Sequence, residues 1–324
     1  MDTFGRNLKI ALTGASHAGS VGVIMEGVPA GLPLSAADFA ADIARRAPSV
    51  KGTTARREED VPLLSGGVYD GLTTGEPLVI EFANKDTRSA DYDRFKAVPR
   101  PGHADRVARL KYGDSCDLRG GGRFSGRMTL PLVAAGAVAK KMLPGMSFDV
   151  RLTAVGGSSD SARWPALIEA AAAEGDSLGG VVSCSVCGVP AGIGEPFFDS
   201  VESLISHAVF SIPGVRGVEF GDGFAASAMR GSEHNDPWTA AGPAKNGAGG
   251  INGGITNGAP VVFRVAFKPT SSIARPQETY NFETGRMDTL TAFGRHDVCF
   301  ALRTPVIVEA MAALVFADLL VGSR

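Results

Sequence analysis

Hydrophobic residues recur in this chain with two different spacings, and this feature restricts its fold more than any other. Apolar residues at helical spacing predict helices at 130–143, 164–174, 200–210 and 305–320. Strands are predicted where apolar and polar residues alternate or where β-branched and aromatic residues are frequent, at 8–13, 21–28, 78–83, 147–154, 180–189 and 260–268. A further helix is expected after Ser35, because Asp38 can complete a capping box there. The chain therefore mixes helices and strands, and the spacing leaves their topology open.

No segment divides the chain into parts. Its 324 residues contain no Pro- or Ser-rich linker and no repeat with a period of about 20–50 residues. We therefore expect one domain, residues 1–324, with two closely fused halves as the alternative. Glycine is abundant, with 42 residues and no collagen-like period. Much of the backbone must turn tightly or approach another group closely.

Charge, cysteine content and hydropathy exclude several classes of protein. A net charge of -2 argues against a globally basic nucleic-acid-binding protein. Four scattered cysteines are too few for a disulfide framework, which fits a reducing cytoplasm. The longest apolar runs fall short of the roughly 18 residues that a membrane span requires, so no membrane partner is expected.

The segment from 84 to 128 is polar, rich in glycine and arginine, and without clear periodicity. It carries five basic side chains among glycines: Arg100, His103, Arg119, Arg123 and Arg127. Glycines let backbone N–H groups approach an anion, and arginine binds phosphate or carboxylate with two parallel hydrogen bonds. The segment therefore predicts an anion site. Taken alone, it would fit a solvated surface loop about equally well.

A second candidate is the sequence FKPTSSI at 267–273, which follows a predicted strand. Lys268 emerges at the strand end beside three hydroxyl groups, a combination that suits the phosphate of a mononucleotide. Taken alone, this pattern is more typical of an ordinary polar turn. The glycine run at 246–258 precedes its strand instead of following one, so a dinucleotide-binding fingerprint is disfavoured. No histidine pair has metal-binding spacing, and we expect no metal.

These motifs, in their order, resemble those of chorismate synthase. The resemblance extends from about residue 8 to 321 and rests on thirteen motifs: GASHAG, EGVPAGLPL, IARR, TTARREED, LSGGVYDGLTTGEPL, NKDTRSADY, RPGHAD, DLRGGGRFSGR, IPGVRGVEFGDGF, RGSEHND, AGGINGGITNG, VAFKPTSSI and GRHDVC. It implies an α+β fold, a β-α-β sandwich with helices between two antiparallel sheets. It also implies a homotetramer and a lyase that uses reduced FMN in the anti-1,4-elimination of phosphate from 5-enolpyruvylshikimate 3-phosphate, giving chorismate in aromatic amino-acid biosynthesis.

The resemblance also implies roles for individual residues. The expected catalytic residues are His17, His103 and Asp297. The expected FMN contacts are Arg123, Phe124, Ser125, Pro213, Gly214, Gly253, Lys268, Pro269, Thr270, Ser271, Ser272 and Arg295. The expected substrate contacts are Ser16, His17, Arg46, Lys51, Arg100, Arg127 and Arg295.

The chemistry of the residues agrees with these roles. A substrate with two carboxylates and a phosphate carries roughly -3.5 to -4 charges, which several arginines must meet. His17 could protonate the leaving phosphate, and His103 could protonate the flavin, with Asp297 tuning that exchange.

Some positions depart from the family pattern. Ala15, Phe124, Gly126 and Met128 replace a glutamate, a serine, an alanine and a glutamate, while Ala47 and Lys51 replace arginines. The alternative hypothesis is therefore a divergent flavin-binding oxidoreductase on the same fold. The sequence also leaves the source of electrons open between the protein's own NADPH-dependent flavin reductase activity and an external reductase.

Overall fold

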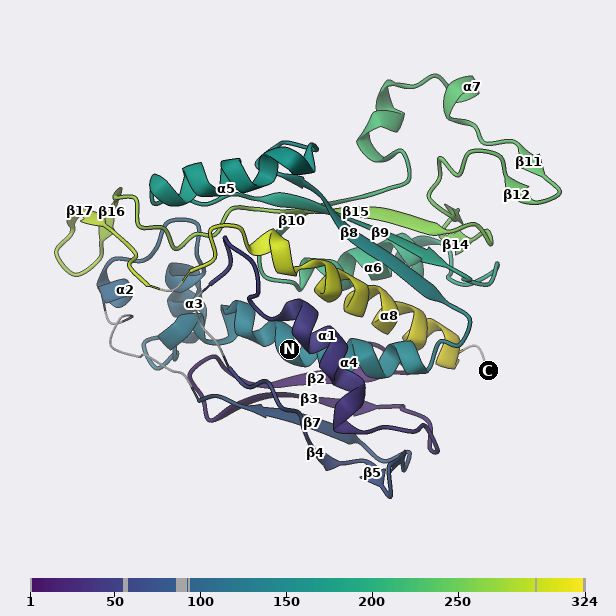
Figure 1. The fold of residues 1–324 in the computed structure, drawn as a ribbon, viewed down its shortest axis with the longest axis horizontal. Helices are drawn as coiled ribbons and strands as arrows, with labels where there is room; N and C mark the ends of the chain where they lie inside the picture. Colours follow the sequence, from purple (N-terminus) through teal and green to yellow (C-terminus); the bar gives the residue numbers. More distant parts are fainter. Residues whose placement is uncertain (1, 55–57, 86–91, 93, 295, 323–324) are drawn as a thin grey trace.

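The computed structural model of the chain describes residues 2–54, 58–85, 92, 94–294 and 296–322. Two antiparallel sheets enclose a layer of helices (Figure 1). The first sheet has the strand order β1-β2-β3-β7-β4: Thr3–Phe4, Lys9–Gly14, Ser20–Glu26, Leu78–Ala83 and Leu63–Gly66. The second has the order β10-β15-β9-β8: Val215–Phe220, Val261–Phe267, Gly180–Cys187 and Ser147–Val155. The expected sandwich is confirmed.

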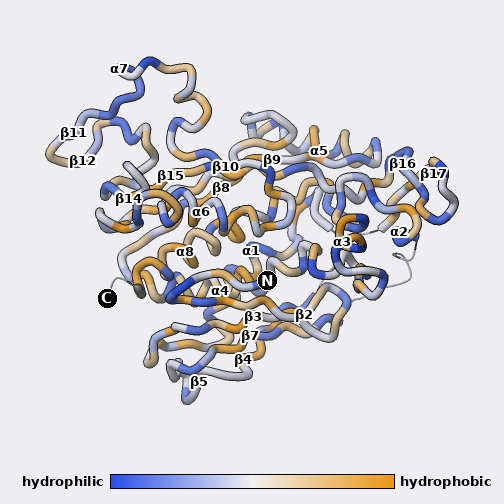
Figure 2. The backbone as a smooth tube through the Cα atoms, turned by 180° about the vertical axis from the view of Figure 1, so that it is seen from behind, coloured by the Kyte–Doolittle hydropathy of each residue, from blue (hydrophilic) through white to orange (hydrophobic). Residues whose placement is uncertain are grey.

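Four helices form the middle layer: α1 (Ala40–Arg46), α4 (Thr129–Lys141), α6 (Val201–Phe210) and α8 (Pro305–Gly322). α8 is apolar on all sides, which is typical of a helix without a solvent face. It packs so closely on α4 that a methyl group at Gly136 would collide with Ala310. Figure 2 shows the hydrophobic character of both helices within the sandwich. None of the described helices is long and apolar enough to cross a membrane.

The remaining elements lie around this core. α5 (Trp164–Ala173) covers the outer face of the second sheet (Figure 1). The helices α2 (Arg94–Ala97) and α3 (Asp105–Tyr112) lie near the hairpin of β16 (Gln277–Asn281) and β17 (Arg286–Leu290). Small hairpins and a projecting arm complete the chain: β5 (Val68–Tyr69) with β6 (Leu72–Thr73), α7 (Gly231–His234), β11 (Trp238–Thr239) with β12 (Gly242–Pro243), and β13 (Ile251–Asn252) with β14 (Ile255–Thr256).

The predicted helices and strands agree with these bounds to within about two residues at each end. The helix after Ser35 begins as a 3₁₀ turn, and the Asp38 carboxylate accepts a hydrogen bond of 2.7 Å from the Ser35 N–H. The prediction of an irregular segment at 84–128 was wrong for α3. Its apolar residues Val107 and Leu110 face solvent, whereas Asp105 and Ala108 are buried. Val107 and Leu110 have helical spacing, but the helix has only eight residues, shorter than the window over which such spacing is informative.

Candidate active site

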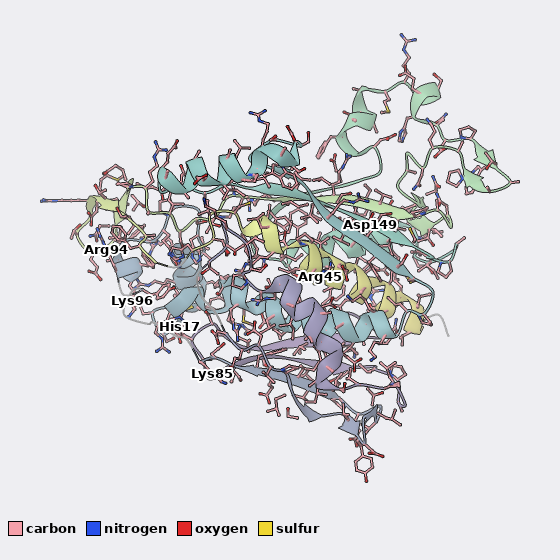
Figure 3. The ribbon with its side chains drawn as sticks, in the orientation of Figure 1. His17, Arg45, Lys85, Arg94, Lys96 and Asp149 are labelled. Atoms are coloured by element: carbon pink, nitrogen blue, oxygen red, sulfur yellow. The ribbon has the colours of Figure 1, made fainter. Side chains whose placement is uncertain are left out.

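A cavity of about 920 Å³ opens at one end of the sandwich, at the upper limit of the usual range for small-molecule sites. Loops that follow β2, α1 and β15 contribute to its wall, together with the turns at 100–104 and 120–127. Figure 3 labels His17, one of the residues that line this cavity. Sixteen of the expected site residues line the cavity: His17, Arg46, Arg100, His103, Arg123, Phe124, Ser125, Arg127, Pro213, Gly214, Lys268, Pro269, Thr270, Ser271, Ser272 and Asp297.

Four expected residues are not among them. Ser16 is fully buried behind the wall, where its N–H donates to the carbonyl of Gly122. The Lys51 side chain is 75% exposed and pairs with Glu169. Gly253 lies in the turn between β13 and β14, where an added methyl group would have no atom of the described residues beyond its chain neighbours within 4 Å. Arg295 falls outside the described residues.

One wall of the cavity is built around the carboxylate of Asp60. Its Oδ1 accepts a hydrogen bond from Nη1 of Arg127, and its Oδ2 lies 3.4 Å from Nη1 of Arg46. The remaining nitrogens of Arg46 donate to Thr129 and to the carbonyl of Gly126. Burial, together with the neighbouring positive charge of Arg303, lowers the pKa of Arg46 to about 9. This wall therefore holds guanidinium groups in fixed positions next to an acid.

The opposite wall carries a buried clamp around Asp105. Arg100 donates to both carboxylate oxygens, at 2.8 and 2.7 Å, and Nδ1 of His103 lies 2.7 Å from Oδ1. The two partners hold the pKa of Asp105 far below its usual range. Burial lowers the pKa of His103, although its bond to Asp105 opposes this shift. His103 is therefore mainly neutral near pH 7, with its Nδ1 hydrogen on Asp105 and Nε2 free to exchange a proton.

The turn Lys268–Ser272 forms a third part of the wall. Nζ of Lys268 donates to the carbonyl of Gly102 at 2.9 Å and also contacts the Ser271 hydroxyl. Burial and the charge of Arg216 lower the pKa of Lys268. Among the described residues no carboxylate pairs with it. The turn thus holds a cation whose charge no acid in the described chain neutralises.

Asp297 completes the wall beside the arginines. Its Oδ1 accepts from the Thr54 N–H at 2.9 Å, and its Oδ2 accepts from Nη2 of Arg303 at 2.8 Å. The carboxylate is therefore fixed at both oxygens.

His17 approaches the cavity from the first sheet, where its ring meets the Tyr92 ring edge-on at 5.3 Å. A methyl group at Gly120, whose φ is 61°, would collide with the His17 ring.

Sequence reasoning assigned no role at this site to five acidic or basic residues: Glu58, Asp60, Asp105, His296 and Arg303. Asp105 belongs to the motif RPGHAD and Asp60 to TTARREED, so both motifs contained the signal. Arg303 is a lone charge in the otherwise apolar stretch from Val298 to Val308, which is unusual unless the charge has a partner or a ligand.

The lining residues favour anion chemistry. Six cationic and three acidic side chains line the cavity within the described chain, together with three histidines. Among these described residues, no three His, Cys, Asp or Glu side chains lie close enough together to hold a metal ion. The arrangement can bind a polyanion and move protons next to it.

Comparisons with known proteins point in one direction. The family model described as chorismate synthase matches residues 8–321. A chorismate synthase of Chitinophaga pinensis is 54% identical over 321 residues, covering 98% of this chain and 96% of its own. One of Korarchaeum cryptofilum is 45% identical, with the same coverage of both chains. A crystal structure of chorismate synthase has a TM-score of 0.76 at 27% identity and covers 99% of this chain and 93% of its own.

Proposed function

The chain belongs to the chorismate synthase family of lyases, and from this premise we propose that it eliminates phosphate from 5-enolpyruvylshikimate 3-phosphate with the help of reduced FMN. The product is chorismate, the precursor in aromatic amino-acid biosynthesis. One observation carries the proposal: six cationic side chains and three histidines surround a single cavity of suitable size. Such a cavity suits a substrate with a phosphate and two carboxylates.

Two features of the cavity fit FMN. The turn Lys268–Ser272 offers a cation without a carboxylate partner among the described residues, and the buried hydroxyl oxygen of Thr270 has no hydrogen-bond partner. Both suit a phosphate. Ile212, Phe293 and Phe300 give the cavity apolar surface that suits a flavin ring. Arg123, Phe124, Ser125, Pro213 and Gly214 would hold the cofactor from the adjoining wall. Gly253 and Arg295 remain expected contacts.

The protein's own groups then have distinct tasks. When bound, reduced FMN would supply electron density to the substrate ring and recover it. Arg46, Arg100 and Arg127 bind the substrate, with Ser16 and Lys51 as further expected contacts. His17 protonates the departing phosphate. His103 moves a proton to the flavin, and the substrate's negative charge raises its lowered pKa for this step. Asp297 tunes this proton exchange at the flavin ring.

We also propose a homotetramer of single-domain chains in the cytoplasm. One hydrophobic core cluster with residues from both sheets supports a single domain. Large apolar side chains that face solvent support the assembly, with Phe197, Phe198, Phe224 and Trp238 between 66% and 91% exposed. The four cysteines are free, as suits a reducing compartment. NADPH is proposed as the electron source if the protein reduces its own flavin.

The decisive experiment is anaerobic incubation of the protein with substrate and dithionite-reduced FMN. We expect chorismate and phosphate in equal amounts and flavin that is reduced again at the end. Flavin oxidation in proportion to the substrate, without release of phosphate, would instead support the oxidoreductase alternative. Adding NADPH and oxidised FMN in place of dithionite tests whether the protein reduces its own flavin.

A further inference from the structure

Among the described residues, four arginines that line the cavity are more than nine-tenths buried: Arg46, Arg100, Arg127 and Arg303. In the first three, every guanidinium nitrogen has a hydrogen-bond partner in the protein. Arg303 differs. Within the described residues its guanidinium makes one hydrogen bond, from Nη2 to Asp297, and its Nε is buried without a partner. A guanidinium has five N–H donors, so most of those of Arg303 are unused.

The unpaired Nε belongs to a larger pattern. Six buried side-chain nitrogen or oxygen atoms of the described chain have no hydrogen-bond partner. Four of them belong to residues that line the cavity or lie directly behind its wall: Ser16 Oγ, Thr270 Oγ1, His296 Nε2 and Arg303 Nε. Leaving a buried polar atom unpaired costs about 1–3 kcal/mol. Their concentration at one place indicates that a ligand with polar groups is bound there.

Electrostatics at Arg303 favour an anion. Arg303 lies close enough to Arg46 for their like charges to repel, and Asp297 is the acid hydrogen-bonded to Arg303. Two neighbouring buried cations are unfavourable in a medium of low dielectric constant. An additional anion beside them would relieve this repulsion and would supply acceptors for the unused donors of Arg303.

We propose that Arg303 binds an oxyanion group of the substrate, either a carboxylate or the phosphate. Arg303 was not among the expected substrate contacts. The inference rests on the function proposed above. Arg303 is then a binding residue in its own right, and its bond to Asp297 sets the orientation of the guanidinium. Protein groups already accept hydrogen bonds from the guanidinium groups of Arg46, Arg100 and Arg127. Arg303 instead supplies N–H donors that can bind the substrate without first breaking a hydrogen bond within the protein.

The test compares Arg303→Gln and Arg303→Lys with the parent protein. Substrate affinity is measured from the change in flavin fluorescence with oxidised FMN, in the absence of turnover. We expect Arg303→Gln to raise the Kd of the substrate about tenfold to a hundredfold, as for the loss of hydrogen bonds to a charged group, and to leave FMN affinity within about threefold. Arg303→Lys keeps the charge but loses the planar guanidinium group, so its Kd for the substrate should lie between those of the parent and of Arg303→Gln.

A control and a competitor sharpen the result. Arg264→Gln removes a guanidinium that pairs with Glu219 outside the cavity and should leave the substrate Kd unchanged. Inorganic phosphate is added as a competitor: its inhibition weakens in the Arg303 variants if the residue holds the phosphate, and stays the same if it holds a carboxylate.

Several outcomes would overturn the inference. An unchanged substrate Kd with lower turnover would mean that Arg303 only positions Asp297. An equal loss of substrate and FMN affinity would indicate a collapsed site. If Arg303→Gln does not fold, Arg303→Lys decides, and a substrate Kd within about twofold of the parent refutes the inference. Failure of the parent protein to bind the substrate would refute the proposed function instead.

Discussion

Two parts of the cavity wall hold their cations in different ways. In the arginine cluster, which consists of Arg46, Arg127 and Arg303 with Asp60 and Asp297, each guanidinium contacts a buried carboxylate. In the lysine turn, Lys268–Ser272, the ammonium group contacts a carbonyl and a hydroxyl, and no described acid pairs with it. Glu58 lies 3.5 Å from Nη2 of Arg127, so three carboxylates face the three guanidinium groups and the cluster is close to charge balance without a ligand, whereas the turn carries a net positive charge.

This difference separates stability from binding. A buried ion pair that loses one partner leaves an uncompensated charge, which is costly to the fold. A cation held by neutral groups has already lost part of its hydration, and an incoming anion restores the lost interaction. The acids of the arginine cluster should therefore matter most for folding, and the lysine turn should matter most for the ligand.

The largest effect is expected for Asp60→Asn. The change removes the carboxylate between Arg46 and Arg127, so both guanidinium groups lose their ion pair with it inside the protein. We expect the free energy of unfolding to fall by about 3–5 kcal/mol, measured by urea denaturation. Asp149→Asn is the control. Asp149, labelled in Figure 3, and its partner Arg151 are both exposed on β8, so the change should cost less than about 1 kcal/mol. Equal losses in the two variants would contradict the contrast.

The histidines between the two regions should affect turnover instead. His17→Ala and His103→Ala are each expected to lower kcat by about 10²-fold or more, as losses of general acid or base groups do. The unfolding curve of His17→Ala should stay near that of the parent, whereas His103→Ala also removes a partner of the buried Asp105 and should lower stability by about 1–3 kcal/mol. Near-normal turnover in one variant would remove that histidine from the mechanism. Steady-state assays under anaerobic conditions give both values.

A smaller effect is expected for Lys268→Met at the lysine turn. Loss of the ammonium should weaken FMN binding by about tenfold or more, because hydrogen bonds to charged groups contribute about 1.5–3 kcal/mol. Stability should change by less than about 0.5 kcal/mol, since burial already disfavours the charged form of this lysine. Lys9→Met, an exposed position on β2, is the matched control. A large loss of stability with unchanged FMN affinity would mean that the lysine turn serves folding and not ligand binding.

The pH dependence of stability should reflect the buried histidines. Burial lowers the pKa of His103 and of His296 below the usual 6.5, so the unfolded chain binds protons that the folded chain does not. The free energy of unfolding should therefore be fully present above about pH 7 and decrease as the pH falls below 6.5. Each histidine contributes a slope of up to about 1.4 kcal/mol per pH unit. Replacing both by glutamine should flatten the curve in this window, and an unchanged slope would contradict this account.

The sequence predicted the sandwich elements well because their apolar spacing is regular. Sixteen of the twenty residues expected at the site also line the cavity, since His17, His103, Lys268 and the others lie in motifs of the family. The sequence did not predict α3, whose eight residues are too few for helical spacing to be informative. Arg303 was missed for a different reason: its position beside Arg46 depends on how η8 (Phe300–Arg303) meets the loop after α1, a tertiary contact that local spacing does not encode.

The smallest effect concerns Phe124, a departure from the family pattern within a motif expected to contact FMN. Phe124 lines the cavity and is 37% exposed, while its neighbours Arg123 and Ser125 keep the family's residue types. If the backbone alone matters here, the ring can lie along the wall without cost. On that basis Phe124→Ser should leave FMN affinity and turnover within about threefold of the parent, a difference below 1 kcal/mol. If a hydroxyl normally donates at this position, serine would restore a hydrogen bond of about 0.5–1.5 kcal/mol. A gain of about tenfold in the affinity for reduced FMN, measured by anaerobic titration, would therefore show that phenylalanine has weakened this wall, and that the contrast between the two regions reflects a degraded cofactor site.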